Sequence, residues 1–419
     1  MAKLDIKTLL FSRHRRSDAA HLFWSACALA FVAGMVMFPR LVFEGAVTGL
    51  NTWWNIVFPA LLPFFIASEL LMNFGVVHFM GVLMEPVMRP LFNVPGAGSF
   101  VVAVGFTSGY PIGSMVTAKL RSKGLCTRVE AERLMSFTNN SSPLFMLVAV
   151  AVGMFNLPGL GVIIAGAHYL SNLTLGLLLR FYARNNRERV AGVSIVGGNP
   201  LTLAFRRMLE VQRQENRPLG KIIGDAVRNA VTSLLNIGGF IILFAVIIRL
   251  LTAVGFIDHL ARCLGILLLP LGFSPELLPA LSSGLFEMTI GTKMVSETAA
   301  PLAQQLTAVG MILAWSGLSI HAQTASMISE TDIRMLPFIV SRIVHTCLGG
   351  LYTYIIYTWA GMTGKIAATA AAFPVKWNGC WSLIPLNLKF FGIFLLLLLL
   401  FTGTGIFLNL AKRPRIKLK

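Results

Sequence analysis

The sequence predicts an all-α polytopic membrane protein with two inverted-topology repeats and about eight full crossings. Of its 419 residues, 56% are hydrophobic and only 12% charged, with a mean hydropathy of +0.75. Such values are typical of membrane proteins. Lys and Arg gather between the apolar segments, and polar, glycine-containing stretches interrupt apolar segments at corresponding places in both halves. Each repeat should therefore hold an interfacial helix, a re-entrant hairpin and a broken transmembrane helix.

Eight apolar segments come close to the roughly 20 residues that cross a bilayer. They start near His21 and Asn51 and cover 132–155, 159–181, 229–252, 306–328, 336–359 and 390–410. The first of them is too long for the apolar part of a cleavable signal and lacks a small-residue cleavage site. It is therefore expected to remain as the first transmembrane helix.

Two further apolar runs, 96–120 and 276–297, are interrupted midway by glycine, proline and polar residues. Irregular backbone at membrane depth is tolerated only where protein encloses it or a cavity is lined by it. We expect re-entrant hairpins here. If these runs were full crossings, the Lys and Arg residues would no longer be concentrated on one side of the membrane. The short mixed segments before them, 76–92 and 257–271, are expected to be interfacial helices.

The basic residues set the expected orientation. The chain has 35 Lys and Arg against 17 Asp and Glu, a net charge of +18. They cluster at 3–16, 119–133, 180–228 and 412–419, between apolar segments, which is the pattern of cytoplasmic loops. This placement argues against nucleic-acid binding and puts both termini in the cytoplasm. Three crossings per repeat, an odd number, would give the two repeats opposite orientations.

The expected organisation follows the chain in order. It comprises a basic N-terminus 1–20, a first transmembrane helix 21–39, repeat one 51–181, a basic cytoplasmic linker 182–227, repeat two 228–360, a last transmembrane helix 386–411 and a basic tail 412–419. The linker holds a predicted surface helix at 201–214. A solvated basic loop is favoured there over docking to anionic lipid or to a partner. The Leu-rich last helix suits lipid or a neighbouring subunit, so homo-oligomerisation stays open.

The four interruptions supply groups that a polar or anionic solute would need. They are 105–114 followed by 136–143, and 282–292 followed by 315–323. Paired breaks in two halves are typical of secondary transporters, and half-helix N-termini offer free N–H groups. The alternative is hydrogen bonding that repairs kinked helices. The candidate solute-binding residues are Thr107, Ser108, Gly109, Tyr110, Asn139, Asn140, Ser141, Ser142, Ser283, Gly284, Glu287, Thr289, Ser316, Ser319, His321, Gln323 and Arg342.

Ionisable residues at membrane depth are functional candidates by default. Arg342 could attract a carboxylate while Glu287 takes a coupling proton or cation, or the two could pair directly. His321 and His345 could carry protons, because imidazole titrates near neutrality, although either could be a packing residue. Glu69 is a further coupling candidate and equally a helix–helix hydrogen-bond partner.

Enzymatic, metal and cofactor chemistry finds little support. The five cysteines are scattered without a CxxC pair, so they are expected to be packing thiols and no metal site is predicted. HExxH, P-loop and GxGxxG motifs are absent from the sequence. Residues 105–109 are similar to an intramembrane serine-protease pattern, but the first glycine, Gly105, is one residue too far from the serine. The chain is expected not to be an enzyme and to need no cofactor.

Six motifs carry a resemblance to a known family. They are Gly109-Tyr-Pro-Ile-Gly113, Glu130-Ala-Glu-Arg-Leu134, Asn139-Asn-Ser-Ser-Pro-Leu-Phe145, Gly284-Leu-Phe-Glu-Met-Thr-Ile-Gly291, Gly317-Leu-Ser-Ile-His-Ala-Gln323 and Ser329-Glu-Thr-Asp-Ile333. Over most of the chain, from about residue 20 to 360, it resembles the YlbJ (SpoVV) family of sporulation integral membrane proteins. That family belongs to the nucleoside-recognition (Gate) domain proteins, whose architecture is similar to that of concentrative nucleoside transporters.

The resemblance implies export of dipicolinate from the mother cell across the outer forespore membrane. Dipicolinate is a flat ring with two carboxylates, so it needs N–H donors, a cation such as Arg342 and a ring surface. Phe106, Tyr110, Phe286 or Trp315 could supply that surface. A nucleoside carrier would instead use Glu287 as its anchor. A non-transporting scaffold of a sporulation complex is the alternative of another class, and the coupling ion stays open.

Overall fold

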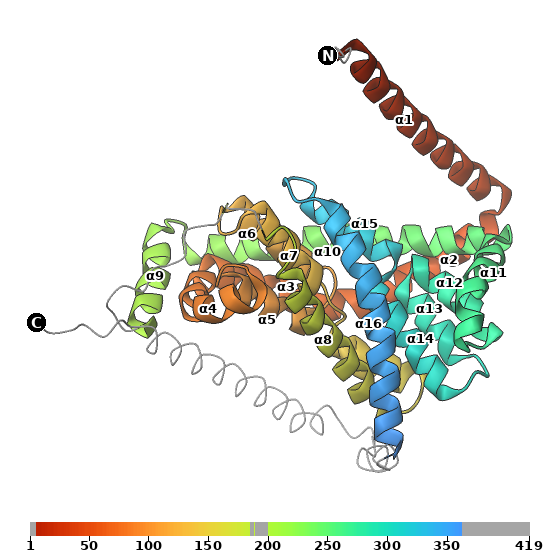
Figure 1. Ribbon diagram of the computed structural model, residues 1–419. Coiled ribbons are helices and arrows are strands. Elements are labelled where there is room, and N and C mark those ends of the chain that lie inside the picture. The colour runs from red at the N-terminus through yellow and green to blue at the C-terminus, as the bar shows by residue number, and fades with distance from the viewer. Residues whose placement is uncertain (1–5, 185–187, 189–199, 363–419) are drawn as a thin grey trace, which may run out of the picture.

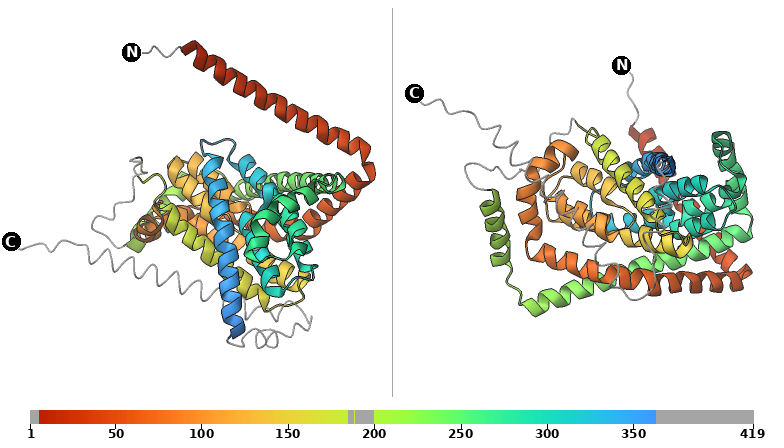
Figure 2. Two further views of the ribbon diagram at one scale, coloured as in Figure 1. Left: turned by 45° about the vertical axis from the view of Figure 1, so that its right-hand side comes forward. Right: turned by 90° about the horizontal axis from the view of Figure 1, so that it is seen from below.

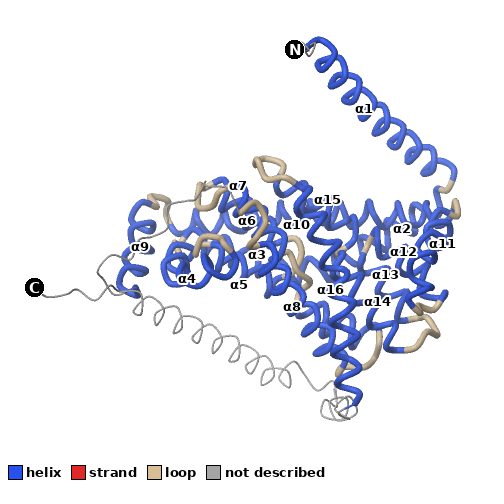
Figure 3. The backbone as a smooth tube through the Cα atoms, in the orientation of Figure 1, coloured by secondary structure: helices blue, strands red, loops and turns tan. Residues whose placement is uncertain are grey.

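The computed structural model describes residues 6–184, 188 and 200–362. In this part of the chain every regular element is helical and no strand occurs, which confirms the all-α prediction (Figure 3). The predicted last transmembrane helix at 386–411 and the basic tail lie outside the described residues, as does most of the predicted linker loop before α9 (Pro200–Gln214).

The chain begins with a long helix that stands apart from the helical body. Helix α1 (Ile6–Met37) points away from the other helices (Figures 1 and 2) and starts well before the span predicted over 21–39. A bend of 103° leads into α2 (Pro39–Thr52). The π-helical turn η1 (Trp53–Val57) then continues into α3 (Phe58–Asn73).

The helices that open the two halves pack along each other. Helix α10 (Leu219–Ala253) runs beside α2, as the right-hand view of Figure 2 shows. A Cβ at Gly49 would lie only 2.8 Å from the Cα of Ile242, so a side chain at this position would prevent the close approach. The indole of Trp53 donates to the carbonyl of Leu234 at 2.9 Å. The two halves therefore meet along a continuous helix–helix contact.

A similar order of elements follows in each half, with two additional 3₁₀ turns in the second. After α3 come α4 (Val76–Phe92), α5 (Gly98–Ser108), α6 (Ile112–Ser122), α7 (Arg128–Thr138), η2 (Phe145–Met154) and α8 (Leu160–Leu179). After α10 come α11 (Phe256–Leu268), η3 (Leu269–Leu271), η4 (Pro275–Leu277), α12 (Leu278–Phe286), α13 (Met288–Ser296), α14 (Leu302–Trp315), α15 (Gly317–Ile328) and α16 (Met335–Met362). The turns before α4 and α11 match, since Gly75 and Gly255 both have left-handed backbone with φ of 75° and 72°. The inverted orientation of the halves stays a prediction.

Within the described residues, three helices are long and apolar enough to cross a membrane: Leu160–Leu179, Leu219–Ala253 and Met335–Trp359. Two bent pairs, 22–37 with 39–55 and 61–73 with 76–92, raise the number to five if each pair is one span. The predicted broken spans consist of separate shorter helices in the structure. Several apolar helices thus support an integral membrane protein, while eight crossings stay a prediction.

The predicted surface helix at 201–214 is present as α9. It packs against α4, where the rings of Phe205 and Phe79 lie 4.9 Å apart. Gln212 donates from its amide to the carbonyl of Phe74 at 3.0 Å. One face of α9 is therefore held against the first half of the protein.

Candidate functional site

The tip of the first hairpin packs against the break in the following broken helix. Helix α5 ends at Ser108 and α6 begins at Ile112, while α7 ends at Thr138 and residues 139–142 are non-helical. Gly109 has φ of 87°, and a Cβ there would lie 2.7 Å from the side chain of Ser142. Only glycine fits this contact, which brings the two polar interruptions of the first half together.

The second half repeats this contact. Glu287 alone separates α12 from α13, and Ser316 separates α14 from α15. Gly317 has φ of 80°, and a Cβ there would lie 3.0 Å from the carbonyl oxygen of Phe286 and 3.1 Å from the Cα of Glu287. All four predicted helix interruptions are therefore present, and in each half the tip lies against the break.

Arg342 of α16 lies where elements of both halves meet, and its side chain is fully buried. Its Nη1 donates to the carbonyl of Asn139 at 3.1 Å, to the carbonyl of Ala314 at 3.5 Å and to the Tyr110 hydroxyl at 3.4 Å. Nη2 donates to the carbonyl of Ser136. The carbonyls of Ser136, Asn139 and Ala314 lie at the C-terminal ends of α7 and α14. The negative end of a helix dipole is located there and favours a cation.

Arg342 has no acidic partner among the described residues. Its guanidinium packs on the Phe338 ring at 5.1 Å, and its Nε lacks a hydrogen-bond partner. Glu287 instead accepts from the N–H of Ile290 at 2.8 Å and so caps α13. Arg342 and Glu287 therefore do not pair directly in the structure, unlike in one of the two predicted alternatives. The guanidinium charge is therefore not neutralised by any carboxylate of the described residues.

Buried polar atoms without partners gather at the interruptions. An unpaired buried polar atom costs about 1–3 kcal/mol, so such a cluster needs an explanation, and a site for a polar solute or water supplies one. Among the described residues these atoms are Ser108 Oγ, Asn139 Oδ1, both amide atoms of Asn140, Ser141 Oγ, Thr292 Oγ1, His321 Nε2 and Gln323 Oε1.

Several contacts join the halves directly at this site. The Tyr110 hydroxyl donates to the carbonyl of Leu313 at 3.0 Å. The Asn139 amide donates to the Thr324 hydroxyl at 3.1 Å, and Ser114 donates to the same oxygen at 3.4 Å. Thr324 was not among the predicted site residues, although it directly follows the motif 317–323.

Helix α8 contributes polar residues that were not predicted from the sequence either. His168 accepts from the main-chain N–H of Ser141 at 3.1 Å, and the Ser171 hydroxyl lies 2.8 Å from Nε2 of His345. The other ring nitrogen of His345 lies 3.2 Å from the carbonyl of Ala314. Asn172 is fully buried beside them and donates to the carbonyl of His168 at 3.1 Å. The available signal was this group of polar residues inside an apolar span.

Some predicted site residues lie elsewhere or are occupied by other contacts. Thr107 is exposed and bonds to the carbonyl of Ala103, and Thr289 is half-buried. Ser142 accepts from the N–H of Phe145 at the start of the next helical segment. Glu69 pairs with Lys119 of α6, which supports its role as a partner between helices.

The other predicted residues of the second half are buried near its break. Gln323 donates to Ser319 at 3.1 Å, and the ring of His321 lies tilted against that of Trp315, with ring centroids 4.5 Å apart. The buried members are Ser283, Gly284, Ser316, Ser319, His321 and Gln323. Of the predicted stacking rings, Phe106 and Phe286 contact rings of the chain itself, Tyr169 and Phe256 respectively.

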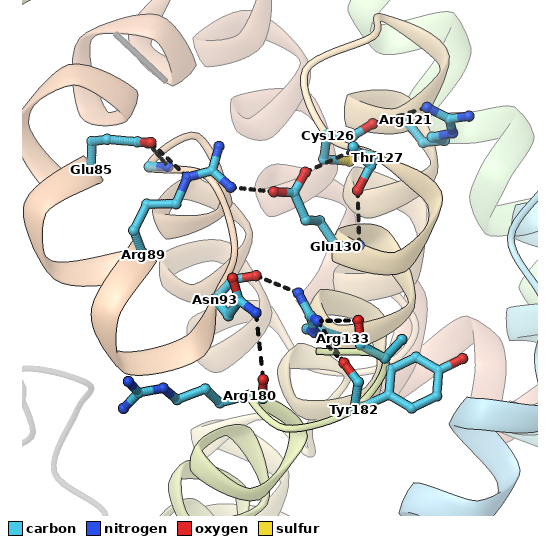
Figure 4. Close-up of polar contacts among 12 residues, drawn as sticks. Glu85, Arg89, Asn93, Arg121, Cys126, Thr127, Glu130, Arg133, Arg180 and Tyr182 are labelled. Atoms are coloured by element: carbon cyan, nitrogen blue, oxygen red, sulfur yellow. Dashed lines mark hydrogen bonds and ion pairs between the residues drawn. The ribbon is translucent and has the colours of Figure 1, made fainter. Parts of the chain in front are cut away.

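Buried charges on α7 tie the first half together beside the site (Figure 4). Glu130 forms a capping box with Thr127 and pairs with Arg89, which also binds Glu85 at 2.7 Å. Arg133 donates to the carbonyl of Asn93 at 2.6 Å. These contacts explain the charges of the motif 130–134, which fix the position of α7.

Two further ion pairs join the halves outside the polar site. The buried carboxylate of Glu132 binds Arg334 at 2.7 Å and accepts from the Tyr182 hydroxyl at 2.8 Å. Arg121 at the end of α6 binds Asp332 through two bonds of 2.8 and 2.7 Å. That guanidinium holds the pKa of the Asp332 carboxyl below its usual range.

Apolar spans, two sets of broken helices and a buried cation among polar groups define an all-helical integral membrane protein. The Gate family model, described as nucleoside recognition, matches residues 55–167. The chain is 46% identical to the sporulation integral membrane protein YlbJ of Bacillus subtilis (strain 168) over 333 residues, which is 78% of this chain and 81% of the relative. It belongs to the YlbJ family.

Another relative is more distant. An uncharacterised protein of Alkalihalophilus pseudofirmus is 32% identical over 138 residues, 31% of this chain and 29% of that protein. No solved structure matches the chain. The family assignment therefore depends on the long match to YlbJ.

Proposed function

We propose that the protein is a secondary transporter of a small anionic solute. The observation that carries this proposal is Arg342, a fully buried cation held by main-chain carbonyls with no acidic partner among the described residues. An intramembrane charge is costly and is typically retained for a solute or ion pathway. Among the unpartnered groups at the first break, the Ser108 and Ser141 hydroxyls and the Asn140 amide nitrogen supply the additional donors that a carboxylate requires.

The solute is dipicolinate, moved from the mother cell across the outer forespore membrane. Support comes from the printed name of the relative, a sporulation integral membrane protein, and from a cation with nearby donors that suits a dicarboxylate. Under this proposal the first-half groups and Arg342 bind the anion. Glu287, which already caps α13, supports the second hairpin tip.

The test is uptake of dipicolinate into liposomes that contain the purified protein, with uridine as the comparison solute. Saturable dipicolinate uptake should fall to background in Arg342→Gln and in a double alanine variant of Asn139 and Asn140. Arg249→Gln, which changes an exposed arginine of α10, is the matched control and should transport normally.

The other outcomes separate the alternatives. Uptake of uridine alone would favour a nucleoside carrier, the class that the Gate description suggests. Normal dipicolinate uptake by Arg342→Gln would remove this residue from the site. Absence of either flux, from folded and inserted protein, would favour a non-transporting scaffold.

A further inference from the structure

His168 of α8 has a buried side chain. It is neither a predicted site residue nor part of the proposed anion site described above. Its side chain is almost fully buried, and that of Asn172 is fully buried one turn later. The ring lies against the first break, because its Nε2 is 3.1 Å from the main-chain nitrogen of Ser141. His168 thus belongs to the wall of the candidate site.

The contact with Ser141 fixes the protonation of the ring. A main-chain N–H can only donate, so Nε2 of His168 must be the acceptor and carries no proton. The ring is therefore neutral, and its proton is on Nδ1. That Nδ1 has no hydrogen-bond partner among the described residues. His168 is thus a buried N–H donor in need of an acceptor.

His168 and Arg342 hold the same segment at two points. Arg342 binds the carbonyl of Asn139, and His168 binds the N–H of Ser141, two residues further along the non-helical break. The Asn139 carbonyl and the Ser141 N–H lie on either side of a single residue, so the two held points are about one residue, roughly 3.5 Å of chain, apart. Asn140 lies between them in sequence, and both of its amide atoms are buried and unpartnered.

We propose that His168 is a further solute-binding residue, which donates from Nδ1 to the second carboxylate of a dicarboxylate while Arg342 binds the first. This inference rests on the proposed anion transport and names what the site selects, a second carboxylate on a small solute. A neutral donor serves this purpose because it remains a donor at any pH at which the Ser141 contact is intact.

Two substitutions separate the two ring nitrogens. His168→Gln places an amide oxygen near the position of Nε2, which keeps an acceptor for Ser141 but removes the Nδ1 donor. His168→Asn places an amide nitrogen near the position of Nδ1, which restores a donor. His259→Gln, in an exposed position on α11, is the matched control.

The measurement is KM and kcat for uptake of dipicolinate and of pyridine-2-carboxylate, which has a single carboxylate. Loss of a hydrogen bond to a charged group predicts that His168→Gln raises the KM for dipicolinate about tenfold or more. The KM for the monocarboxylate should not change. His168→Asn should recover part of the preference for dipicolinate, and His259→Gln should match the unaltered protein.

Equal effects of His168→Gln on both solutes, or no effect on either, would overturn the inference. If the unaltered protein transports both solutes and the variant does the same, only the role of His168 fails. If the unaltered protein transports neither, the proposed function fails and this inference fails with it.

Discussion

At the scale of single residues, the contact between hairpin tip and break depends on glycine. Gly317→Ala should destabilise the protein for two reasons. The added Cβ would lie 3.0 Å from the Phe286 carbonyl oxygen, and alanine would have to adopt the left-handed backbone conformation of this position. The backbone strain costs about 1 kcal/mol, and the overpacking should add about 1–3 kcal/mol. The measurement is the thermal unfolding midpoint in detergent.

Gly255→Ala is the control for this substitution. Gly255 has a similar φ of 72°, but nothing lies within 4 Å of the added Cβ. It should therefore show the strain without the overpacking. Equal midpoints for the two variants would contradict the packing of the second tip against its break.

The site residues differ in how well sequence could predict them. Asn139, Asn140 and Ser141 were predicted because amide and hydroxyl groups beside Pro143 are conspicuous in an apolar segment. His168 was missed because α8 has no helix break and reads as an ordinary span. The carbonyl groups that bind Arg342 could not be predicted, because any residue type can supply a carbonyl and only the fold determines which ones meet.

At the scale of elements, α7 is held to the second half by a buried carboxylate. Glu132 has a fully buried side chain, whereas Arg334 is half exposed. Arg334→Gln leaves the Glu132 carboxylate with the Tyr182 hydroxyl and the more distant Arg128. We expect a loss of stability on the order of 2 kcal/mol, because a buried charge loses its partner.

Thermal or chemical unfolding of the inserted protein measures this loss. Glu44→Gln is the control, since it removes the exposed pair of Arg40 and Glu44 within α2. Exposed pairs contribute about 0–1 kcal/mol, so little change is expected. An equally small change in Arg334→Gln would show that the Glu132 pair does not hold α7 in place.

Element positions were predictable where composition changes along the chain. Helix α4 occupies the predicted segment 76–92, and α9 fits the predicted 201–214. Pairings between elements were not predictable. Glu132 and Arg334 are 202 residues apart, and nothing local links them.

At the scale of the whole molecule, acid should weaken the contact between the halves. The lowered pKa of Asp332 means that its pair with Arg121 contributes full stability above the ordinary carboxyl pKa near 4. That contribution is lost as pH falls towards the lowered value. The effect should be small, because the Asp332 side chain is 48% exposed and solvent screens the pair.

Unfolding midpoints across the acid range test this linkage. Asp332→Asn should be less stable than the unaltered protein at neutral pH, and the two midpoints should converge below pH 4 or so. A constant difference through that range would show that protonation of Asp332 does not weaken the contact.

The cradle of Arg342 has an evolutionary consequence. The carbonyls of Ser136, Asn139 and Ala314 belong to the main chain, so no point substitution at these positions deletes them. Side chains around these carbonyls can change during evolution, while the main-chain groups that hold the guanidinium persist. Under the proposed function, one scaffold would thus give rise to carriers for different anions, provided the arginine itself is retained.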